Sequence, residues 1–587
     1  MGFHVVTEPI IDFLYPNKDN LLLEYFPNLL STTDQFSSIS FVRLQRESIE
    51  QKLAARSEVE TAKRRLSPIL ADAMRRVHGV QFSNDYWDIL LGPWMHTAIS
   101  NLYLRLENFH LSLQVGPITS MCLISSARNN HVALDTSEYF RLIQNIEWKN
   151  ARDWRISKHL GLNLSAIKRQ LPSNSLSPML IGKSERSISQ LLKSRLQKAT
   201  TLFNGYNPGL FLETYMPRLT EFKVNLLLRQ FPSANRPINW QQTLHFSNSH
   251  RPEIRDKFLA DIGTAEIDEN DKFLLTELAE QIPSVFLEHY AEVRLKSKMI
   301  YPKNVSFVFT SNSFHQDELF KFWIAEKKLS GTKYLVGQHG NNYGANTLIT
   351  PTNEELTCDC FFTWGWKVPE DKYLPSVVLK TAGLKLTLKH DGGLLLLSTA
   401  VPNGHSAWDE TIEYFDQLQQ QHAFVDRLDE SIKPSTTIRI PALNSLIGDV
   451  MPNAWNKDPV PYRLDLGLAP YSKVRTQYRL AVFSYDSTGL LEGLASNVPS
   501  MAFWLDGLDH LNDFARAKYQ ILVDAGIVFL DSTDCATMVN EVWDDVDGWW
   551  KSKEIQEARE KFCANFCEYS DKPARDIAKA IRRAIAS

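Results

Sequence analysis

The sequence has little cysteine and no long apolar run. Six cysteines in 587 residues are too few for a disulfide framework and suit a reducing compartment. The longest apolar stretch, Leu394–Val401, is much shorter than the roughly 18 residues that a membrane-spanning helix needs. The first residues also lack the basic-then-apolar order of a signal peptide. We therefore expect a cytosolic protein without a transmembrane segment.

The chain also lacks an excess of charge of one sign. Its 64 basic and 68 acidic residues give a net charge of −4, which argues against a nucleic-acid binder. Apolar residues make up 43% of the chain, a globular composition that excludes a disordered or coiled-coil protein. No P-loop, G-x-S-x-G elbow or H-E-x-x-H motif is present, so three common kinds of active site are absent.

The N-terminal part is predicted to be rich in helix. Apolar residues at helical spacing indicate a helix over about 59–77, and a second helix over 85–108 is interrupted by Gly92-Pro93. Residues up to about 300 mix short apolar runs with polar stretches, and we expect helices and long loops there. The first 60 residues show no clear pattern.

Strands alternate with helices in the rest of the chain. The β-branched and aromatic run 305–310 and the run Lys333–Gly337 predict two strands. The helix between them should start at the capping-box signature Ser313-x-x-Gln316. Such a β-α-β unit has parallel strands. Further strands are expected over 360–364, 394–398, 436–440, 479–485, 500–504 and 527–530, followed by helices near 551–566 and 571–586. We therefore predict an α/β protein with domains 1–385 and 386–587.

Three loops at strand ends are candidate ligand sites, because parallel α/β sheets bind ligands beyond the carboxyl ends of their strands. They are 310–313, 338–344 and 486–489. The first two follow neighbouring strands and should lie close together. In the second, His339 stands among glycines and amides and can hold a phosphate or move a proton near neutral pH. A loop histidine can also simply cap local backbone, but the glycine-rich surroundings favour a site.

The third loop leads directly into a helix. Ser487 or Thr488 can cap that helix, whose backbone N–H groups and dipole attract an anion. Glu492 lies one turn further, where a carboxylate can accept hydrogen bonds from ribose hydroxyls. A capped helix with a surface glutamate is the alternative interpretation.

Three weaker patterns favour ordinary structure. Asp545-x-Asp547 spells a metal-binding D-x-D but lies in an acidic, Trp-flanked segment. The cysteine pairs 358/360 and 563/567 lack the C-x-x-C spacing of zinc knuckles. The basic clusters at 63–65 and 75–76 are typical of solvated helix faces, with an anionic substrate or membrane surface as the alternative.

Four motifs together carry a family resemblance. They are Asp85–Trp94 (DYWDILLGPW), Gln338–Gly344 (QHGNNYG), Thr363–Trp366 (TWGW) and Ser487–Pro499 (STGLLEGLASNVP). This set resembles a family of transferases encoded in bacterial surface-polysaccharide gene clusters, over roughly residues 60–570. The second and fourth motifs are also similar to those of capsule Kdo transferases and, more distantly, of CDP-glycerol glycerophosphotransferases.

The resemblance implies a GT-B glycosyltransferase, in which two Rossmann-like domains face each other across a cleft. It implies a CMP-activated 3-deoxy-ulosonic or nonulosonic sugar as donor, a glycan or lipid-linked glycan as acceptor, and no metal or other cofactor. A lipid-linked acceptor would bring the cytoplasmic protein to the inner membrane as a peripheral protein. The implied donor-binding residues are Gln338, Gly340, Arg439, Ser487, Thr488, Gly489 and Glu492, with His339 at the donor phosphate. In the N-terminal domain, Asn312 would orient the sugar, and Asp317 and Glu318 are candidates for the base or nucleophile.

The sequence departs from the family pattern in two places. No opening strand is evident in the first 60 residues, and Asn341-Asn342 follow Gly340 where a second glycine is usual. Two alternative functions stay open. One is a phosphotransferase that uses a CDP-alditol at the same helix end, and the other is a non-catalytic subunit of glycan assembly.

Overall fold

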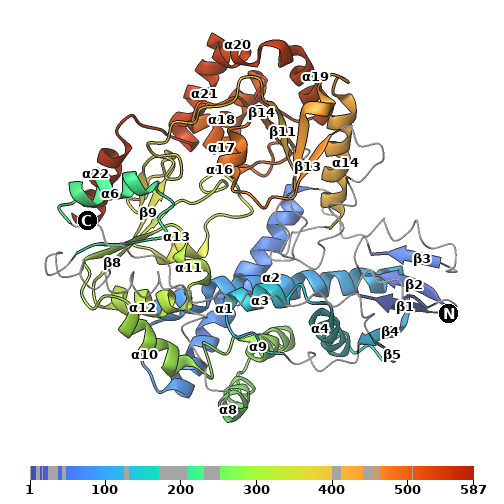
Figure 1. Ribbon diagram of the computed structural model, residues 1–587. Coiled ribbons are helices and arrows are strands. Elements are labelled where there is room, and N and C mark those ends of the chain that lie inside the picture. Colours follow the sequence, from blue (N-terminus) through green and yellow to red (C-terminus); the bar gives the residue numbers. More distant parts are fainter. Residues whose placement is uncertain are drawn as a thin grey trace, which may run out of the picture. The chain divides into compact units, whose positions relative to one another are not determined.

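The computed structural model describes most of the chain (Figure 1). The described residues are 2–7, 13–15, 18–23, 38–42, 48–124, 131–170, 208–230, 252–398, 411–440, 455, 462–504 and 507–586. They form two compact units. The first comprises Met1–Lys183, His245–Leu295 and Val401–Phe415, and the second comprises Ser184–Leu244, Lys296–Ala400 and Asp416–Ser587. The boundary predicted near residue 385 falls inside the second unit, between its two sheets.

The first unit contains a five-stranded parallel sheet in the order β3-β2-β1-β4-β5. Its strands are β1 (Phe3–Val6), β2 (Asp19–Leu22), β3 (Ser38–Phe41), β4 (Ile118–Ile124) and β5 (Ser165–Arg169). The order is that of a doubly wound nucleotide-binding sheet. An opening strand is therefore present, and the expectation that it is missing was wrong. The first three strands have only four residues each, too few for a clear alternation.

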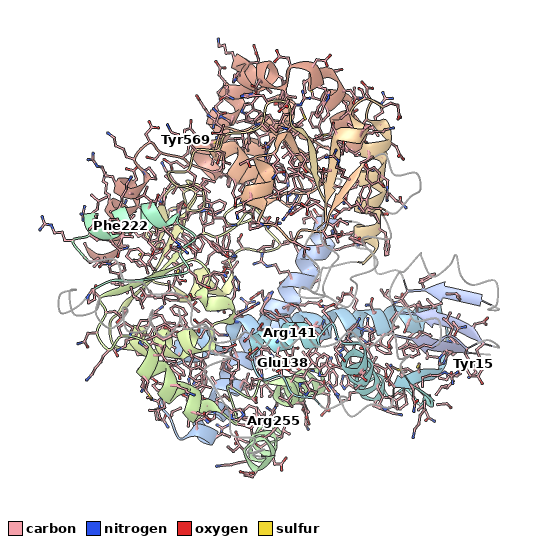
Figure 2. All side chains as sticks on the ribbon, in the orientation of Figure 1. Tyr15, Glu138, Arg141, Phe222, Arg255 and Tyr569 are labelled. Atoms are coloured by element: carbon pink, nitrogen blue, oxygen red, sulfur yellow. The ribbon has the colours of Figure 1, made fainter. Side chains whose placement is uncertain are left out.

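Helices make up most of the remainder of the first unit. They are α1 (Ile49–His78), α2 (Asn84–Val115), α3 (Thr136–Leu142), α4 (Ile146–His159), α8 (Pro252–Ile262) and α9 (Glu269–Gln281). The helix predicted over 59–77 is confirmed. It begins earlier, because the Ser48 side chain accepts from Gln51 N, and it ends at Gly79, whose φ is 64°. Arg255 of α8 fixes the neighbouring turn by pairing with Glu288 and donating to the carbonyls of Ala279 and Ile282 (Figure 2).

The helical prediction for residues 60–300 holds only in part. It missed β4 and β5, and also β6 (Leu210–Leu212) of the second unit. Residues 171–207 and 231–251 of that range lie outside the described part of the chain. In the parts that are described, no helix combines the length and the apolar character needed to cross a membrane.

The second unit contains two parallel sheets. One runs β10-β9-β8-β7-β6, in sequential order. Its strands are β6, β7 (Phe307–Thr310), β8 (Lys333–Gly337), β9 (Cys360–Thr363) and β10 (Tyr373–Pro375). The C-terminal helix α22 (Pro573–Ala586) packs beside α6 (Arg218–Leu227), and Ile577 and Ile581 of α22 join the core of this sheet (Figure 1). Phe222 of α6 instead remains exposed (Figure 2).

The other sheet runs β13-β12-β11-β14-β15-β16. Its strands are β11 (Gly393–Leu397), β12 (Thr436–Arg439), β13 (Arg463–Asp465), β14 (Tyr478–Phe483), β15 (Ser500–Phe503) and β16 (Val528–Phe529). This is the Rossmann order 3-2-1-4-5-6, whose ligand crevice lies at the carboxyl ends of strands 1 and 4. Here those strands are β11 and β14, and the 486–489 loop follows β14. The predicted α/β class and parallel strands are confirmed.

Short helices connect these strands. They are α10 (Tyr290–Ile300), α11 (Ser313–Gln316), α12 (Glu318–Leu329), α13 (Asn353–Thr357), α14 (Thr411–Arg427), α16 (Tyr471–Arg475), α17 (Thr488–Ala495), α18 (Asp513–Asp524), α19 (Ser532–Val542), α20 (Val546–Lys551) and α21 (Lys553–Phe566), with 3-10 turns at Lys433–Ser435 and Trp543–Asp545. The capping box expected at Ser313 was wrong. The cap of α12 is Asp317, whose carboxylate accepts from Phe320 N at 2.9 Å.

Candidate functional site

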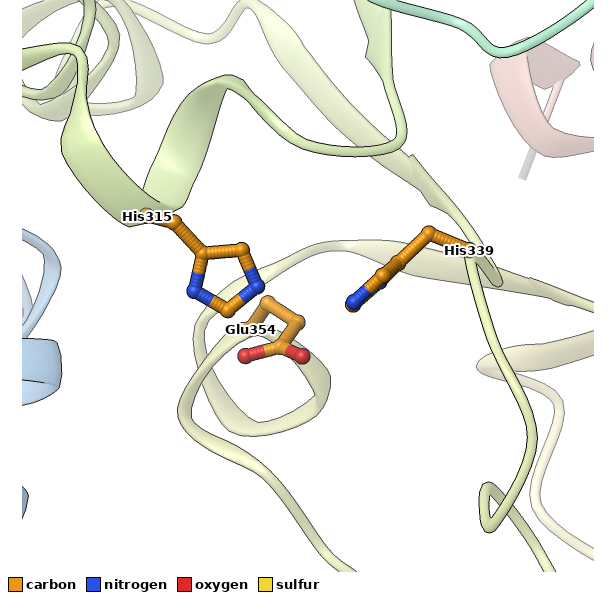
Figure 3. Close-up of side chains that lie close together, drawn as sticks. All are labelled: His315, His339 and Glu354. Atoms are coloured by element: carbon orange, nitrogen blue, oxygen red, sulfur yellow. The ribbon is translucent and has the colours of Figure 1, made fainter. Parts of the chain in front are cut away.

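The loops after β7 and β8 meet at the carboxyl edge of the sequential sheet. The His315 ring on α11 lies 5.2 Å from the His339 ring, between centroids. Glu354 of α13 faces both histidines (Figure 3). The prediction that these two loops lie close together is confirmed. It follows from parallel pairing, which brings successive strand ends to one edge.

A chain of hydrogen bonds links His339 to a buried carboxylate. The Tyr343 hydroxyl donates to Glu354 Oε1 and lies 3.0 Å from His339 Nδ1. Tyr343 and Glu354 are each only 5% exposed. Among the described residues, His339 Nε2 makes no hydrogen bond.

The protons of this chain can be assigned from burial. Burial raises the pKa of Tyr343 well above its usual value, so the phenol stays protonated. Its hydroxyl hydrogen is used in the hydrogen bond that it donates to Glu354. Burial, helped by His315, lowers the pKa of His339 to about 4, so the imidazole is neutral at pH 7. The Tyr343 oxygen can then only accept from His339 Nδ1–H. This tautomer leaves a lone pair on Nε2, which can accept a proton.

The conformation of the 338–344 loop explains its composition. Asn342 has φ 77° and Gly344 has φ 67°, in the left-handed region that glycine and asparagine tolerate best. Asn342 thus adopts this conformation without a glycine. A Cβ at Gly344 would overlap the Trp366 indole. The Gln338 amide is used within the fold, because its oxygen accepts from Trp364 N and Trp366 Nε1 and its nitrogen donates to Gly340 O.

The same loop contacts the strand-end loop of the Rossmann-ordered sheet. Asn341 N donates to Thr488 Oγ1 at 3.0 Å, and Asn341 Nδ2 donates to Asp486 Oδ1 at 2.6 Å. Asp486 also accepts from Tyr519 and lies 3.3 Å from His510 Nε2. The two loops selected from the sequence are therefore neighbours within one unit, and Asp486 joins them.

Helix α17 begins as the sequence predicts. The Ser487 side chain accepts from Gly489 N at 3.0 Å and caps the helix. Glu492 lies one turn inside and forms an ion pair with Lys380, with 3.1 Å between Oε1 and Nζ. Gly489 packs so closely on Phe483 that a Cβ there would lie 2.5 Å from the ring, which holds the helix start against β14.

Of four other predicted residues, three have side chains held in local contacts and the fourth, Asn312, does not. Arg439 pairs with Asp465 and donates to Ala469 O. Glu318 is fully buried against Lys321, 2.7 Å away. Asp317 caps α12 and accepts from Tyr301, and burial raises its pKa to about 7. Asn312 stands at the start of α11 without a side-chain capping bond.

One group of described residues could hold a metal ion. Candidate ligand atoms of His315, His339 and Glu354 all lie within 4.8 Å of one another (Figure 3). Tetrahedral zinc with bonds of 2.0–2.2 Å places its ligand atoms about 3.3–3.6 Å apart. Any pair of ligand atoms separated by the full 4.8 Å would have to close toward such an ion.

The patterns set aside in the sequence have structural roles. Asp545 caps α20, and Asp547 pairs with His390. All six cysteines are buried and unbridged. In the basic clusters, Arg65 pairs with Asp271 and Arg76 with Asp261.

The sequence analysis missed Tyr215 and Lys380, which lie beside His339 and Glu492, and Glu213, which accepts from the Ser313 hydroxyl. Tyr215 follows β6 with φ 58°, and its ring lies 6.3 Å from the His339 ring. Lys380 Nζ lies 5.0 Å over the Tyr215 ring. Burial raises the pKa of Glu213, which has φ 41°. Non-glycine residues with positive φ are uncommon and mark such sites, but only the structure reveals them.

Comparisons with known proteins identify a family. A family model described as "LIC12162 family transferase" matches residues 4–581. None of the curated proteins matches the chain. Solved structures with a similar arrangement include MnaA of S. aureus with UDP, at 10% identity and a TM-score of 0.34, covering 65% of this chain and 97% of that one. The wall teichoic acid polymerase TagF is 10% identical with a TM-score of 0.31, and the match covers 68% of this chain and 99% of that one. MurG of Acinetobacter baumannii is 10% identical with a TM-score of 0.29, and the match covers 64% of this chain and 99% of that one.

Proposed function

The chain belongs to the LIC12162 family of transferases, and from this premise we propose that it is a GT-B glycosyltransferase of bacterial surface-glycan assembly. It moves a 3-deoxy-ulosonic or nonulosonic sugar from a CMP-activated donor to a glycan acceptor. Most of the acceptor side lies before residue 385 and most of the donor side after it.

The observation that carries the proposal is the hydrogen-bond chain Glu354–Tyr343–His339. It holds a neutral imidazole at a strand end and leaves Nε2 able to take a proton. A positioned histidine of this kind is the commonest general base in enzymes. His339 therefore acts on the acceptor hydroxyl, instead of donating to the donor phosphate as the resemblance implies.

The reaction has a definite proton path. The acceptor hydroxyl gives its proton to His339 Nε2 and its oxygen forms the new bond to the anomeric carbon of the sugar, while CMP leaves with the electron pair of the broken carbon–oxygen bond. The imidazolium that forms donates from Nδ1 to Tyr343, whose own proton stays on the Glu354 side. Asp317 and Glu318 take no part, because both carboxylates are buried in contacts of α12.

Donor binding is assigned to the 486–489 loop and the start of α17. The amides at the start of α17 and the Ser487 and Thr488 hydroxyls face charge that grows on the departing phosphate, which is the usual way to stabilise such charge without a metal. Glu492 accepts from the ribose hydroxyls. The choice of cytidine rests on the similarity of the 338–344 and 487–499 motifs to those of capsule Kdo transferases. The protein works in the cytoplasm, at the inner membrane where the acceptor is lipid-linked.

Thermal unfolding with a panel of nucleotides tests the donor assignment. A ligand that binds only the folded protein at 100 times its Kd stabilises it by about 2.7 kcal/mol. We expect CMP to raise Tm more than UMP, UDP or ADP at equal concentration. A larger shift with UDP or ADP would contradict the cytidine assignment.

Product analysis with CMP-activated sugars then separates the alternatives. Release of CMP together with a new glycosidic bond supports the proposal. Release of CMP from a CDP-alditol with a new phosphodiester would identify a phosphotransferase. Nucleotide binding without turnover on any donor would indicate a non-catalytic subunit.

A further inference from the structure

Lys380 lies between the two candidate loops and was not selected by any sequence motif. Its Nζ lies 3.1 Å from Glu492 Oε1 and 5.0 Å from the centre of the Tyr215 ring. The Lys380 side chain is 36% exposed, whereas that of Glu492 is 17% exposed. The ammonium group can therefore be reached from solvent, while its carboxylate partner is largely covered.

The backbone on both sides of Lys380 is fixed. Val378 N donates to Glu568 O at 2.9 Å, and the Thr220 hydroxyl donates to Ala382 O at 2.7 Å. Leu379 is buried against β8 so closely that a Cβ at Gly337 would lie 2.6 Å from its Cδ1. Gly337 directly precedes the 338–344 loop. Lys380 is thus positioned relative to that loop, and only its flexible side chain can move.

Three other described basic groups near this site already have partners. Arg439 pairs with Asp465 and donates to backbone carbonyls. Lys321 is fully buried with Glu318. His339 Nδ1 is hydrogen-bonded to Tyr343. Lys380 is a partly exposed cation that can meet an anionic ligand beside α17.

We propose that Lys380 binds the phosphate of the donor and changes partner to do so. In the free protein it pairs with Glu492. When the phosphate arrives, the ammonium turns to it, and the Glu492 carboxylate accepts the ribose hydroxyls instead. Partly exposed ion pairs contribute little to stability, so this pair can exchange readily. The identity of the ligand as a nucleotide donor rests on the proposed function, but the prediction of an anion at Lys380 does not.

Binding of pyrophosphate and of CMP, measured by calorimetry, tests this exchange. Lys380→Met should weaken binding of both ligands on the order of tenfold or more. Lys380→Arg keeps the charge and should bind both within severalfold of the unchanged protein. Lys389→Met, at an exposed lysine of the same connecting segment, is the matched control and should change neither. Equal Tm values without ligand show that the variants are folded.

The decisive variant is Glu492→Gln, because its two effects have opposite signs. Pyrophosphate, which has no ribose, should bind severalfold more tightly once the competing carboxylate charge is gone. CMP should bind more weakly, because its ribose loses a charged acceptor. Unchanged or weaker pyrophosphate binding would overturn the exchange, and unchanged binding to Lys380→Met would overturn the phosphate contact. If UDP replaces CMP as the tighter nucleotide, the donor assignment fails while the pyrophosphate result still decides the role of Lys380. A protein that binds neither pyrophosphate nor any nucleotide overturns both proposals.

Discussion

The two loops that meet in the second unit differ in their chemistry. The 338–344 loop and its neighbours carry buried titratable groups with shifted pKa values: His315 and His339 are lowered and Tyr343 is raised, each chiefly by burial. The 486–489 loop places the Ser487 and Thr488 hydroxyls at the start of a capped helix. Groups with shifted pKa values suit proton transfer, and helix amides suit a fixed anion. The comparison therefore assigns proton transfer in the proposed reaction to the 338–344 loop and phosphate binding to the start of α17, which Lys380 reaches from the segment between β10 and β11.

The contacts between the loops differ from the contacts within them. Within each loop, glycines and caps fix the backbone, as at Gly344 and Ser487. Between the loops, Asn341 alone supplies hydrogen bonds to both Thr488 and Asp486. A residue that shapes one loop can thus be distinguished by experiment from one that aligns the two loops.

The largest expected effect is that of His339→Ala. Loss of the general base should lower kcat by about 10²–10⁴ and change the donor KM much less, because the ribose and phosphate contacts remain on the other loop. Steady-state kinetics with varied donor and acceptor measure both constants. The Tm of the variant serves as the control for folding. A near-normal kcat in a folded variant would show that His339 is a structural residue and that the reaction centre lies elsewhere.

Tyr343→Phe removes the hydroxyl that holds His339 Nδ1–H. The bond strengthens when His339 becomes an imidazolium, and charge-assisted bonds contribute about 1.5–3 kcal/mol, so kcat should fall roughly ten- to a hundredfold. The His339 pKa of about 4 lies below its unfolded value near 6.5, so kcat/KM should be constant at neutral pH and fall only as pH approaches 4. In the variant this acid limb of the profile, the fall of kcat/KM at low pH, should move to lower pH, because the imidazolium has lost its hydrogen-bond acceptor.

A purely structural role of Tyr343 would give a different profile. The variant would then lose activity equally at every pH and unfold at lower temperature, with the acid limb unmoved. Asn145→Ala is a suitable comparison, because Asn145 caps α4 in the first unit by accepting from Trp148 N. Loss of a cap costs about 1 kcal/mol of stability and should leave the limb in place.

Glu492→Gln should produce a smaller, ground-state effect. The ribose is remote from the breaking bond, so its contacts should be similar in the ground and transition states. The donor KM should therefore rise about tenfold while kcat changes little. Initial rates over a range of donor concentrations measure this. A fall in kcat at unchanged KM would place Glu492 in the chemical step. The division of the reaction into proton transfer at one loop and donor binding at the other would then be wrong.

The sequence predicted the sheets better than the site. The strand Lys333–Gly337 was predicted with its observed bounds, because a β-branched and aromatic run is bounded there by turn residues. β6 was missed because three residues show no period. Ser313 looked like a helix cap, but a four-residue turn intervenes and Asp317 is the cap.

Only part of the site could be predicted from the sequence, because local patterns reveal where a side chain stands in the chain but not which distant side chain it contacts. His339, Ser487 and Glu492 follow strands or open a helix, and local patterns reveal such positions. The partners of these residues do not follow from local patterns. Glu354 reaches His339 through Tyr343 from a separate helix, and Lys380 reaches Glu492 only after the chain has folded.

The smallest expected effect is that of a chelator. Phosphate charge is assigned to helix amides, hydroxyls and Lys380, and the Asp545 carboxylate caps a helix, so activity should survive EDTA nearly unchanged. The histidine and carboxylate ligand atoms within 4.8 Å of one another supply the competing hypothesis, in which an ion bound there activates the acceptor. His315→Gln separates the two, because it removes one of three ligands and leaves the bonds of Tyr343 intact. Proton transfer by His339 alone predicts that this variant keeps most of its kcat and that metal content, measured on the purified protein, is substoichiometric. The metal hypothesis would be supported if EDTA abolished activity, Zn²⁺ or Mn²⁺ restored it, and His315→Gln lacked it. His339 would then not act as a free base, and an ion bound at this site would activate the acceptor.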